Sequence, residues 1–356
     1  MTYADRKDDH VRLAVAQHTG HVRESPYDDV RFLHHALAGI GEAAVSLETE
    51  VAGMTWPVPL FVNAMTGGSD RTRIINQGLA RAARETGLPI ACGSMSAYLA
   101  DPAVADTYRV IRAENPDGVV IANVNANTSP EAARRAVDLI DADALQIHLN
   151  SVQEIVMREG DRDFSAWPRN VERMIAALDV PVVVKEVGFG LSARTIGLLA
   201  DLGVRTADVS GRGGTNFAAI ENSRRGQAAL PYLDDWGQSA PACLIEAADV
   251  ARRRDVVLLA SGGVRHPLDV VRALALGAGA VGVSGTFLSL LDSSGSEVLT
   301  TAIRDWITQI RRLMVVLGAP TVAALTHTDV LCTGELAEFC RLREIDLAGY
   351  GRRSSG

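Results

Sequence analysis

The chain has 356 residues, of which 47% are hydrophobic and 22% are charged, and its formal net charge is −8. This composition is ordinary for a globular protein, and the negative charge argues against a nucleic-acid-binding surface. No apolar stretch reaches the roughly 20 residues that cross a bilayer, and the first residues do not read as a signal peptide, so we expect a cytoplasmic protein that binds no membrane.

Residues 1–57 precede the first strongly apolar segment, and we expect them to form an N-terminal arm and a cap. They open with a basic cluster, Arg6, Lys7 and His10. The cluster is either a mobile, solvated terminus or an arm that folds over an anionic substrate. A helix is predicted over 26–37, and 47–60 reads as a small strand pair that caps the bottom of the fold.

Eight short apolar runs then recur at intervals of about 30 residues. They are rich in valine and isoleucine and lack strict alternation, which is typical of strands buried on both faces. Helix-like segments separate most of them, so the sequence predicts an α/β fold, a (β/α)8 TIM barrel over 58–291. The runs are 59–64, 89–93, 118–123, 144–149, 180–186, 206–210, 255–261 and 280–285.

Several segments between and after these runs carry clear start and stop signals. A helix is predicted over 71–85, ended by Gly87, and further helices begin at Ser129, Ser192 and Pro267. The connection 211–240 is far longer than the others. Long connections in compact domains are often functional, so it reads as a lid or binding loop, with a subunit contact as the alternative.

The sequence of the C-terminal part of the chain predicts helices beyond the barrel. Residues 292–350 contain two apolar segments of helical period, 297–317 and 334–345. We interpret them as the closing helix and a C-terminal helical extension. The last residues, 351–356, are polar and we expect a disordered tail.

Glycine-rich loops follow the last two runs. Gly262 and Gly263 follow the seventh run, and Gly285 ends the eighth. In a barrel, the ends of all strands line a single mouth, and the loops after strands seven and eight commonly bind phosphate through backbone N–H groups. The pattern predicts a phosphate cradle, whereas the simpler alternative is that the glycines only turn the chain.

Charged and polar side chains end the fourth and fifth runs. Lys185 follows a run of valines, and a lysine cannot remain unpaired in an apolar core. It therefore faces an anion at the mouth, such as a flavin, a substrate phosphate or a Schiff-base carbonyl, or it forms a structural pair with a carboxylate. His148, Asn150, Gln153 and Glu154 can together bind a diphosphate, hold Mg²⁺ and move a proton, unless the histidine is merely structural.

These residues carry a resemblance to the type 2 isopentenyl-diphosphate isomerases, an FMN-dependent family. The most specific matches are the opening Arg-Lys-x-x-His, the His-Leu-Asn-x-x-Gln-Glu segment and the Gly-Gly-Thr stretch. The matching segments run in order along nearly the whole chain: 6–10, 63–68, 93–102, Asn123, 146–154, 182–190, 210–222, 261–278 and 283–288.

The resemblance implies FMN that is active when reduced, NADPH as the flavin reductant, and Mg²⁺. It implies interconversion of isopentenyl and dimethylallyl diphosphate by a 1,3-proton shift, in a homo-oligomer that is a tetramer or octamer. By residue matching, FMN binds Met65, Thr66, Gly67, Ser94, Asn123, Lys185, Ser210, Thr215, Gly262, Gly263, Val264, Arg265, Ser284 and Gly285. The substrate binds Arg6, Lys7, His10, Ser94, Met95, Ser96, His148, Asn150 and Gln153.

The implied catalytic residues are Gln153, His148, Asn150 and Glu221, and the implied Mg²⁺ ligand is Glu154. Our hypothesis is that the flavin N5 atom donates and accepts the proton while Gln153 positions the group. Glu221 is a second candidate for the base that removes the allylic proton.

The chain departs from the family pattern at three places, one of which is Asn125, where a small residue is usual. Met95-Ser96 stands where many relatives carry Gln-Arg, and Phe217 stands where tryptophan is common. A different isoprenoid diphosphate as substrate therefore stays open.

Two other functions stay open. An FMN-dependent 2-hydroxy-acid oxidase or dehydrogenase on the same barrel needs a histidine beside an arginine after the sixth strand, but the loop 210–217 contains Arg212 and no histidine. A flavin-binding sensor or scaffold without catalysis is the third hypothesis. The polar set at the mouth argues against it, because unused buried polar groups are costly.

Overall fold

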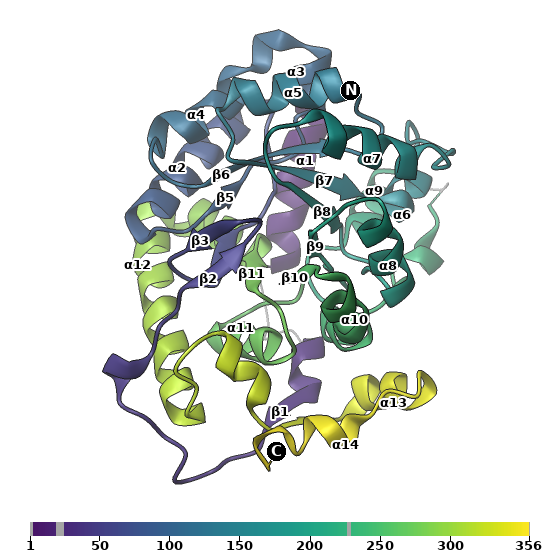
Figure 1. Cartoon of the computed structure of the whole chain (residues 1–356). Helices are drawn as coiled ribbons and strands as arrows, with labels where there is room; N and C mark the ends of the chain where they lie inside the picture. The colour runs from purple at the N-terminus through teal and green to yellow at the C-terminus, as the bar shows by residue number, and fades with distance from the viewer. Residues whose placement is uncertain (1–2, 19–24, 226–228, 356) are drawn as a thin grey trace.

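A closed barrel of eight parallel strands forms the centre of the protein (Figure 1). The structure, a computed structural model, describes residues 3–18, 25–225 and 229–355. The strands follow one another around the barrel in chain order, and the last pairs with the first, which confirms the predicted TIM barrel. They are β4 (Leu60–Val62), β5 (Ile90–Ala91), β6 (Val120–Asn125), β7 (Ala144–Leu149), β8 (Val182–Glu186), β9 (Thr206–Asp208), β10 (Val257–Ser261) and β11 (Ala280–Val283).

A hairpin closes the amino-terminal end of the barrel, as predicted. Its strands are β2 (Thr49–Val51) and β3 (Met54–Trp56), paired antiparallel. Trp56 is fully buried and packs edge-on against Phe61 of β4, with ring centroids 5.4 Å apart. This apolar plug closes the bottom and leaves the opposite end for a site.

Helices surround the barrel and cover its apolar strands. The start signals in the sequence are used as predicted: the Ser129 and Ser192 side chains accept hydrogen bonds from backbone N–H groups of the first turns that follow them. The left-handed Gly87 ends the first of these helices. They are α2 (Asp70–Thr86), α3 (Ser96–Ala100), α4 (Asp106–Glu114), α5 (Pro130–Leu139), α6 (Ser151–Val156), α7 (Trp167–Ala177), α8 (Ala193–Asp201), α9 (Phe217–Arg225), α10 (Ala240–Arg254) and α11 (Pro267–Ala275).

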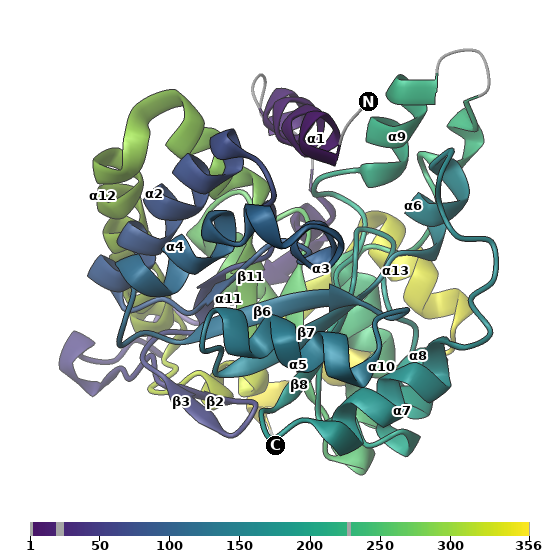
Figure 2. The ribbon, with the colours of Figure 1, turned by 90° about the horizontal axis from the view of Figure 1, so that it is seen from above.

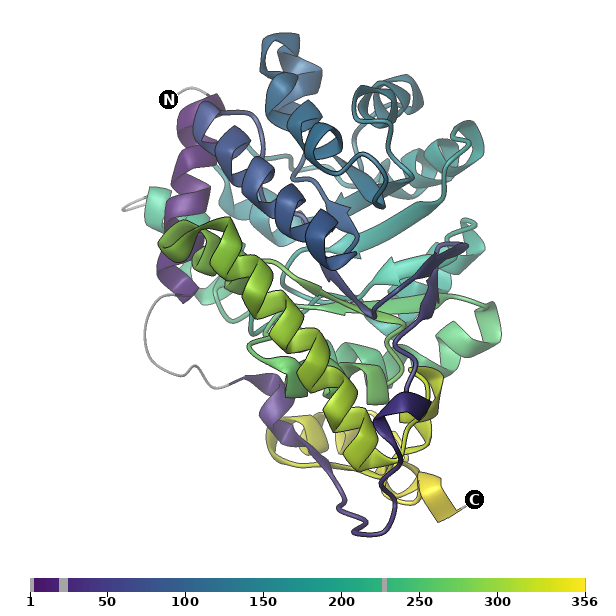
Figure 3. The ribbon, with the colours of Figure 1, turned by 90° about the vertical axis from the view of Figure 1, so that its left-hand side faces the viewer.

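The N-terminal arm is a helix, α1 (Tyr3–His18), at the carboxyl end of the barrel strands. It packs against α12 (Gly285–Leu317), α2 and α9, and Figure 2 shows it lying between these helices above the barrel. Figure 3 shows the same helix beside the amino-terminal half of α12. The arm therefore covers the end where the site is expected.

The helix predicted over 26–37 is wrong. Ser25 and Pro26 do start a helical turn, but this turn is a 3-10 helix that ends at Asp29. Residues Val30–Phe32 then form β1, which pairs antiparallel with β12 (Val330–Cys332). The backbone groups of this segment form their hydrogen bonds with a strand from the other end of the chain, and these replace the hydrogen bonds of the predicted helix.

The C-terminal region also differs in detail from the prediction. The closing helix α12 already begins at Gly285 and is interrupted by the non-helical Gly295 before it continues to Leu317. Two short helices follow, α13 (Gly334–Leu342) and α14 (Leu347–Tyr350).

The tail that we expected to be disordered is held in place up to residue 355. The backbone N–H and the hydroxyl of Ser354 both donate to the buried carboxylate of Asp329, at 2.8 and 2.7 Å. Among the described residues, no helix has the combination of length and apolar character that spanning a bilayer demands.

Candidate active site

Two adjoining cavities open at the carboxyl end of the barrel. We call the first the cradle cavity; of the predicted residues it is lined by Met65, Lys185, Ser210, Thr215, Gly262, Gly263, Val264, Ser284 and Gly285. We call the second the mouth cavity; it has a volume of about 450 Å³ and is lined by Arg6, Lys7, His10, Met65, Ser94, Ser96, Asn123, His148, Asn150, Gln153, Glu154 and Lys185. Most of the residues singled out from the sequence therefore meet at one place.

The two cavities share a wall. Ala64, Met65, Lys185, Val187 and Phe217 line both of them. An elongated ligand can therefore extend from the cradle cavity into the mouth cavity along these residues.

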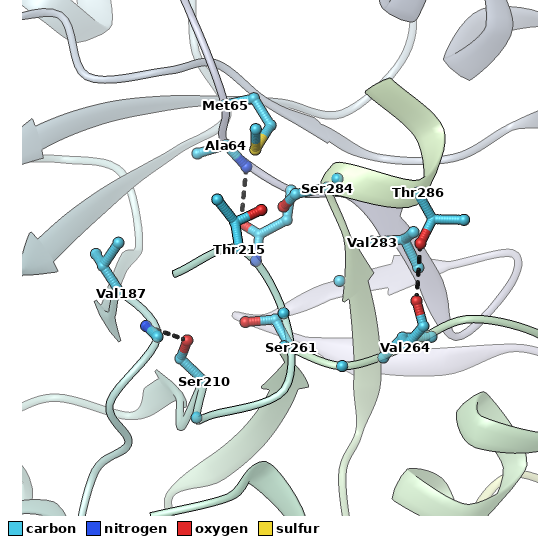
Figure 4. A pocket seen from close by; sticks show the side chains of 18 of the residues that line it. Ala64, Met65, Val187, Ser210, Thr215, Ser261, Val264, Val283, Ser284 and Thr286 are labelled. Carbon is cyan, nitrogen blue, oxygen red and sulfur yellow. Dashed lines mark hydrogen bonds between the residues drawn. The ribbon is translucent and has the colours of Figure 1, made fainter. Parts of the chain in front are cut away.

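Glycine backbone forms one side of the cradle cavity, and Figure 4 shows the neighbouring side chains. Gly262 has φ +88°, and a Cβ there would lie 2.4 Å from the carbonyl oxygen of Gly211, so only glycine fits. The first turn of α12 begins at Gly285 beside it, and the Thr286 hydroxyl donates to the Val264 carbonyl at 2.9 Å. The backbone at Gly262 is thus left uncovered by a side chain, as a phosphate cradle would require.

Lys185 lies between the two cavities and is buried. Its Nζ atom donates to the Glu186 carbonyl at 2.6 Å and lies 3.8 Å from the Asp208 carboxylate. Lys185 therefore has the carboxylate partner of the structural alternative, and it also lines the cavities where an anionic ligand could bind.

Asp208 is a residue that we did not predict for the site. It is completely buried, and its carboxylate accepts hydrogen bonds from Asn63 Nδ2 at 2.8 Å, from Ser261 Oγ at 2.8 Å and from the Ser210 backbone at 3.0 Å. A carboxylate inside an apolar strand requires a cation or several donors, and this was the available signal in the run 206–210. Asp208 anchors Lys185 and the strand ends around it.

Side-chain amides extend this network across the barrel to His148. Gln146, also not predicted, donates to Asn63 at 3.3 Å and accepts from Asn123 at 2.7 Å. The Asn123 oxygen lies 2.8 Å from His148 Nδ1. This chain fixes the orientation of the His148 ring at the floor of the mouth cavity.

The environment of His148 favours a neutral imidazole. Burial, with the positive charges of Lys185 and Lys7, lowers the pKa of His148 to about 3. Since Asn123 Oδ1 can only accept, Nδ1 carries the proton and Nε2 keeps its lone pair. An anionic ligand in the mouth cavity would raise the pKa of His148 again, because it opposes the effect of the two lysines.

The polar residues of α6 form a second group on the mouth cavity. Asn150 Nδ2 donates to Glu154 Oε1 at 2.9 Å, and the Asp161 backbone donates to the other carboxylate oxygen, also at 2.9 Å. Gln153 Nε2 donates to Glu221 Oε1 at 3.2 Å. Glu154 is thus an oriented carboxylate at the cavity, whereas Glu221 stands behind Gln153.

Glu221 is held as a carboxylate. Burial alone would raise its pKa, but the hydrogen bond and charge of His10, the charge of Arg224 and the Gln153 hydrogen bond together bring the pKa of Glu221 below its usual value. His10 Nε2 lies 2.8 Å from Oε1, and Arg224 pairs with the other oxygen. Glu221 is therefore held in its ionised form, which leaves it free of a proton, although the lowered pKa also makes it a weaker base than an ordinary glutamate.

The basic cluster of the arm faces the mouth cavity, so the arm reading is supported over the mobile terminus. Lys7 is only 8% exposed, and burial together with the neighbouring Arg6 lowers its pKa to about 8. Arg6 pairs with Glu159 at 3.3 Å. α1 therefore brings positive charge to the cavity that also contains His148.

Some predicted residues lie outside both cavities. Met95 is fully buried beneath the mouth, and the Arg265 guanidinium is directed at Asp28 and Asp269. Thr66 and Gly67 are buried behind Met65, and Glu221 stands behind Gln153.

Comparison with known proteins gives a consistent result. The model of the FMN-dependent dehydrogenase family matches residues 108–332. The isopentenyl-diphosphate delta-isomerase of Streptomyces sp. (strain CL190) is 58% identical over 355 residues, which cover 100% of this chain and 97% of that protein. The chain belongs to the isopentenyl-diphosphate delta-isomerase family.

Other relatives in this family extend the comparison. The isomerase of Nocardia farcinica is 59% identical and that of Latilactobacillus sakei 44% identical, and the matches cover 99% and 96% of this chain and 96% and 97% of the relatives. A solved structure of mandelate oxidase with 2-hydroxy-phenylacetamide superposes with a TM-score of 0.64 at 19% identity, over 94% of this chain and 100% of that chain. At this identity the similarity concerns the barrel fold.

Proposed function

We propose that this protein interconverts isopentenyl and dimethylallyl diphosphate by a 1,3-proton shift, with FMN in the cradle cavity and the substrate in the mouth cavity. The observation that carries the proposal is the shared wall at Met65, Lys185 and Val187, which joins a glycine-lined cradle to a cavity rich in cations and amides. This pairing suits a flat cofactor with a phosphate tail beside a diphosphate that has a small apolar end.

The residues present fit FMN. Among the described residues, the Thr66 hydroxyl, which follows Met65 in the chain, is buried without a hydrogen-bond partner. The backbone at Gly262, Gly263 and Gly285 would hold the phosphate, while Lys185, Asn123 and Ser94 would surround the ring. Reduced FMN, with NADPH as its reductant, would supply a proton donor and acceptor at N5.

The mouth cavity would bind the diphosphate by charge and hydrogen bonds. Lys7 provides a cation, and a diphosphate beside His148 would raise the pKa of its imidazole, because the anion opposes the effect of burial and of the nearby positive charges. Ser94 and Ser96, with hydroxyls 3.0 Å apart, line the same cavity and offer donors. Asn150 also lines this cavity, and its amide Nδ2 is a donor that orients Glu154 at 2.9 Å.

Glu154 would hold Mg²⁺. A single oriented carboxylate suits this ion, because Mg²⁺ is usually bound through one or two carboxylates, substrate phosphates and water. Glu154 meets this description, since both of its oxygens are fixed by donors at 2.9 Å.

Gln153 and Glu221 would serve the proton shift. Gln153 lines the mouth cavity and is anchored by Glu221, so it would orient the reacting carbons. Glu221, kept ionised by His10 and Arg224, is the candidate base for the allylic proton.

A 2-hydroxy-acid oxidase is the less suitable function. That reaction needs a histidine beside an arginine after the sixth strand to remove the substrate proton, and the loop 210–217 contains Arg212 but no histidine. His266 is the histidine that follows the glycine loop, yet it lines neither cavity and its side chain is 46% exposed beside Asp269. The mouth cavity instead presents the cations and amides that a diphosphate requires.

Deuterium incorporation tests the proposal. Purified protein with reduced FMN in deuterated water should convert isopentenyl diphosphate and label it, whereas protein with oxidised FMN should not. Lactate and glycolate should leave the oxidised flavin unbleached. Unlabelled substrate with reduced FMN, or bleaching by a hydroxy acid, would contradict the proposal.

Two variants test the assigned roles. Gln153→Ala should lower turnover by roughly 100-fold, as expected for a group that supports proton transfer, and Gln77→Ala, on α2 and bonded to Glu114, serves as the control. Glu154→Gln should raise the Mg²⁺ concentration needed for half-maximal rate. Unchanged turnover in Gln153→Ala would refute its role.

A further inference from the structure

The last residue of α1 reaches the cradle cavity, although it belongs to the arm and not to a glycine loop. His18 lines the cavity, and its Nε2 atom lies 3.1 Å from Thr215 Oγ1. A Cβ placed on Gly285 would lie 2.1 Å from the same nitrogen. The imidazole therefore lies directly against the first residue of α12.

The neighbouring contacts fix the end of α1 at this place. The Gln17 side chain pairs with the Asn216 backbone in both directions, accepting from N–H at 2.8 Å and donating to the carbonyl at 3.2 Å. Asn216 follows Thr215 directly, so the partners of Gln17 and His18 are adjacent. The position of the imidazole is thus set by two consecutive residues of the helix.

The charge of a phosphate makes the position of the His18 imidazole relevant to cofactor binding. A phosphate monoester carries about −1.5 to −2 charges at pH 7, and the cradle loops contribute mainly backbone N–H groups. The arginine of the loop after β10, Arg265, is directed to Asp28 at 2.7 Å and Asp269 at 3.0 Å. Among the described residues that line the cavity, only Lys185 and His18 are titratable, and Lys185 lies beside Asp208.

We propose that His18 is a ligand of the FMN phosphate, so that the cofactor site includes the end of the N-terminal arm. This inference rests on the proposed function, because it requires FMN in the cradle cavity. The imidazolium would donate a hydrogen bond to the phosphate, a charge-assisted contact that adds to the backbone donors.

The same helix then links cofactor and substrate. Lys7 and His10 face the mouth cavity from the first half of α1, and His18 lies in the cradle cavity at its end. At 1.5 Å per residue, the backbone of Lys7 lies about 17 Å from that of His18, so one rigid helix spans both cavities. A bound phosphate would hold α1 closed and thereby place the substrate cations.

Comparison of FMN with riboflavin, which lacks the phosphate, tests the contact. Quenching of flavin fluorescence gives the Kd of each. His18→Ala should weaken FMN binding about tenfold, the loss expected for a hydrogen bond to a charged group, and leave riboflavin binding unchanged. Arg12→Ala, on the same helix with a side chain 61% exposed, is the matched control and should bind both flavins normally.

His18→Gln provides a second variant, because it keeps an N–H donor without the charge. It should fold and bind FMN with an affinity between those of wild type and His18→Ala. Equal FMN affinity in wild type and His18→Ala, or equal losses for FMN and riboflavin, would overturn the proposal. If the wild-type protein binds neither flavin, the proposed function itself fails, and this result is distinct from a normal FMN affinity in His18→Ala.

Hydrogen exchange of residues 3–18 tests the link between the cavities. FMN should slow exchange in this segment of the wild-type protein, whereas riboflavin should not. In His18→Ala, FMN should protect the segment no better than riboflavin does. Equal protection by both flavins in the wild-type protein would contradict the role of the phosphate.

Discussion

Nε2 of His10 lies 2.8 Å from Oε1 of Glu221, although 211 positions separate the two residues in the chain. The contact joins the N-terminal helix to α9 at the wall of the mouth cavity. His10 also packs edge-on against Phe217, with ring centroids 6.1 Å apart. The position of α1 and the ionisation of Glu221, the candidate base, are thus coupled through the side chain of His10.

We expect His10→Ala to lower kcat/KM roughly 100-fold and to shift the acid limb of its pH profile upward. As the proposed base, Glu221 must be ionised, so activity should fall as the pH drops through its pKa. His10 is a main cause that lowers this pKa, while burial raises it, so removing His10 moves the fall to higher pH. His34→Ala, on an exposed segment away from the cavities, is the control; an unmoved acid limb would contradict the coupling.

The alkaline limb should depend on Lys7. Its pKa is lowered to about 8, so the positive charge available to a diphosphate is lost as the pH rises through this value. We expect kcat/KM to decline above about pH 8 in the wild-type protein, measured with saturating FMN. Lys7→Arg keeps its charge and should abolish this decline. A decline of the same shape in Lys7→Arg would assign it to another group.

Asp208 should contribute strongly to stability. Asp208→Asn leaves Lys185 buried without its carboxylate, and breaking a buried pair in this way costs about 3 kcal/mol or more of unfolding free energy. The double variant Lys185→Met/Asp208→Asn should be less destabilised than the sum of the single changes.

Urea denaturation of the flavin-free protein measures these effects. Asp292→Asn removes the partner of Arg71 in an exposed pair at 3.2 Å and should change stability by less than about 1 kcal/mol. Strict additivity in the double variant would show that Asp208 does not compensate the charge of Lys185.

The cradle should tolerate no side chain at Gly262. Gly262→Ala places a Cβ 2.4 Å from the Gly211 carbonyl oxygen, so the loop must shift and FMN affinity should fall at least tenfold, as for the loss of one strong hydrogen bond to a charged group. Gly277→Ala is the matched control, because Gly277 also has a positive φ, +102°, but a Cβ there meets no atom within 4 Å. Equal FMN affinities in the two variants would contradict the cradle.

The amino-acid sequence by itself determined the barrel and the location of its site. Strands buried on both faces produce continuous apolar runs, so their number and order are visible without any tertiary contact. Since barrel strands end at one mouth, the positions of Lys185, His148 and Gly263 followed from the same pattern. The apolar runs and the polar residues that end them are local features, so they can be recognised from the spacing of residues in the sequence.

Only the tertiary structure decided which distant residues meet. The helix expected over 26–37 became strand β1 because β12 pairs with it from the far end of the chain. The carboxylate of Asp208 beside Lys185, and the imidazole of His18 against Gly285, depend on how separate elements pack. Hydrogen bonds and charge pairs between residues so far apart in the chain produce no repeating pattern in the sequence. They are therefore visible only in the folded structure.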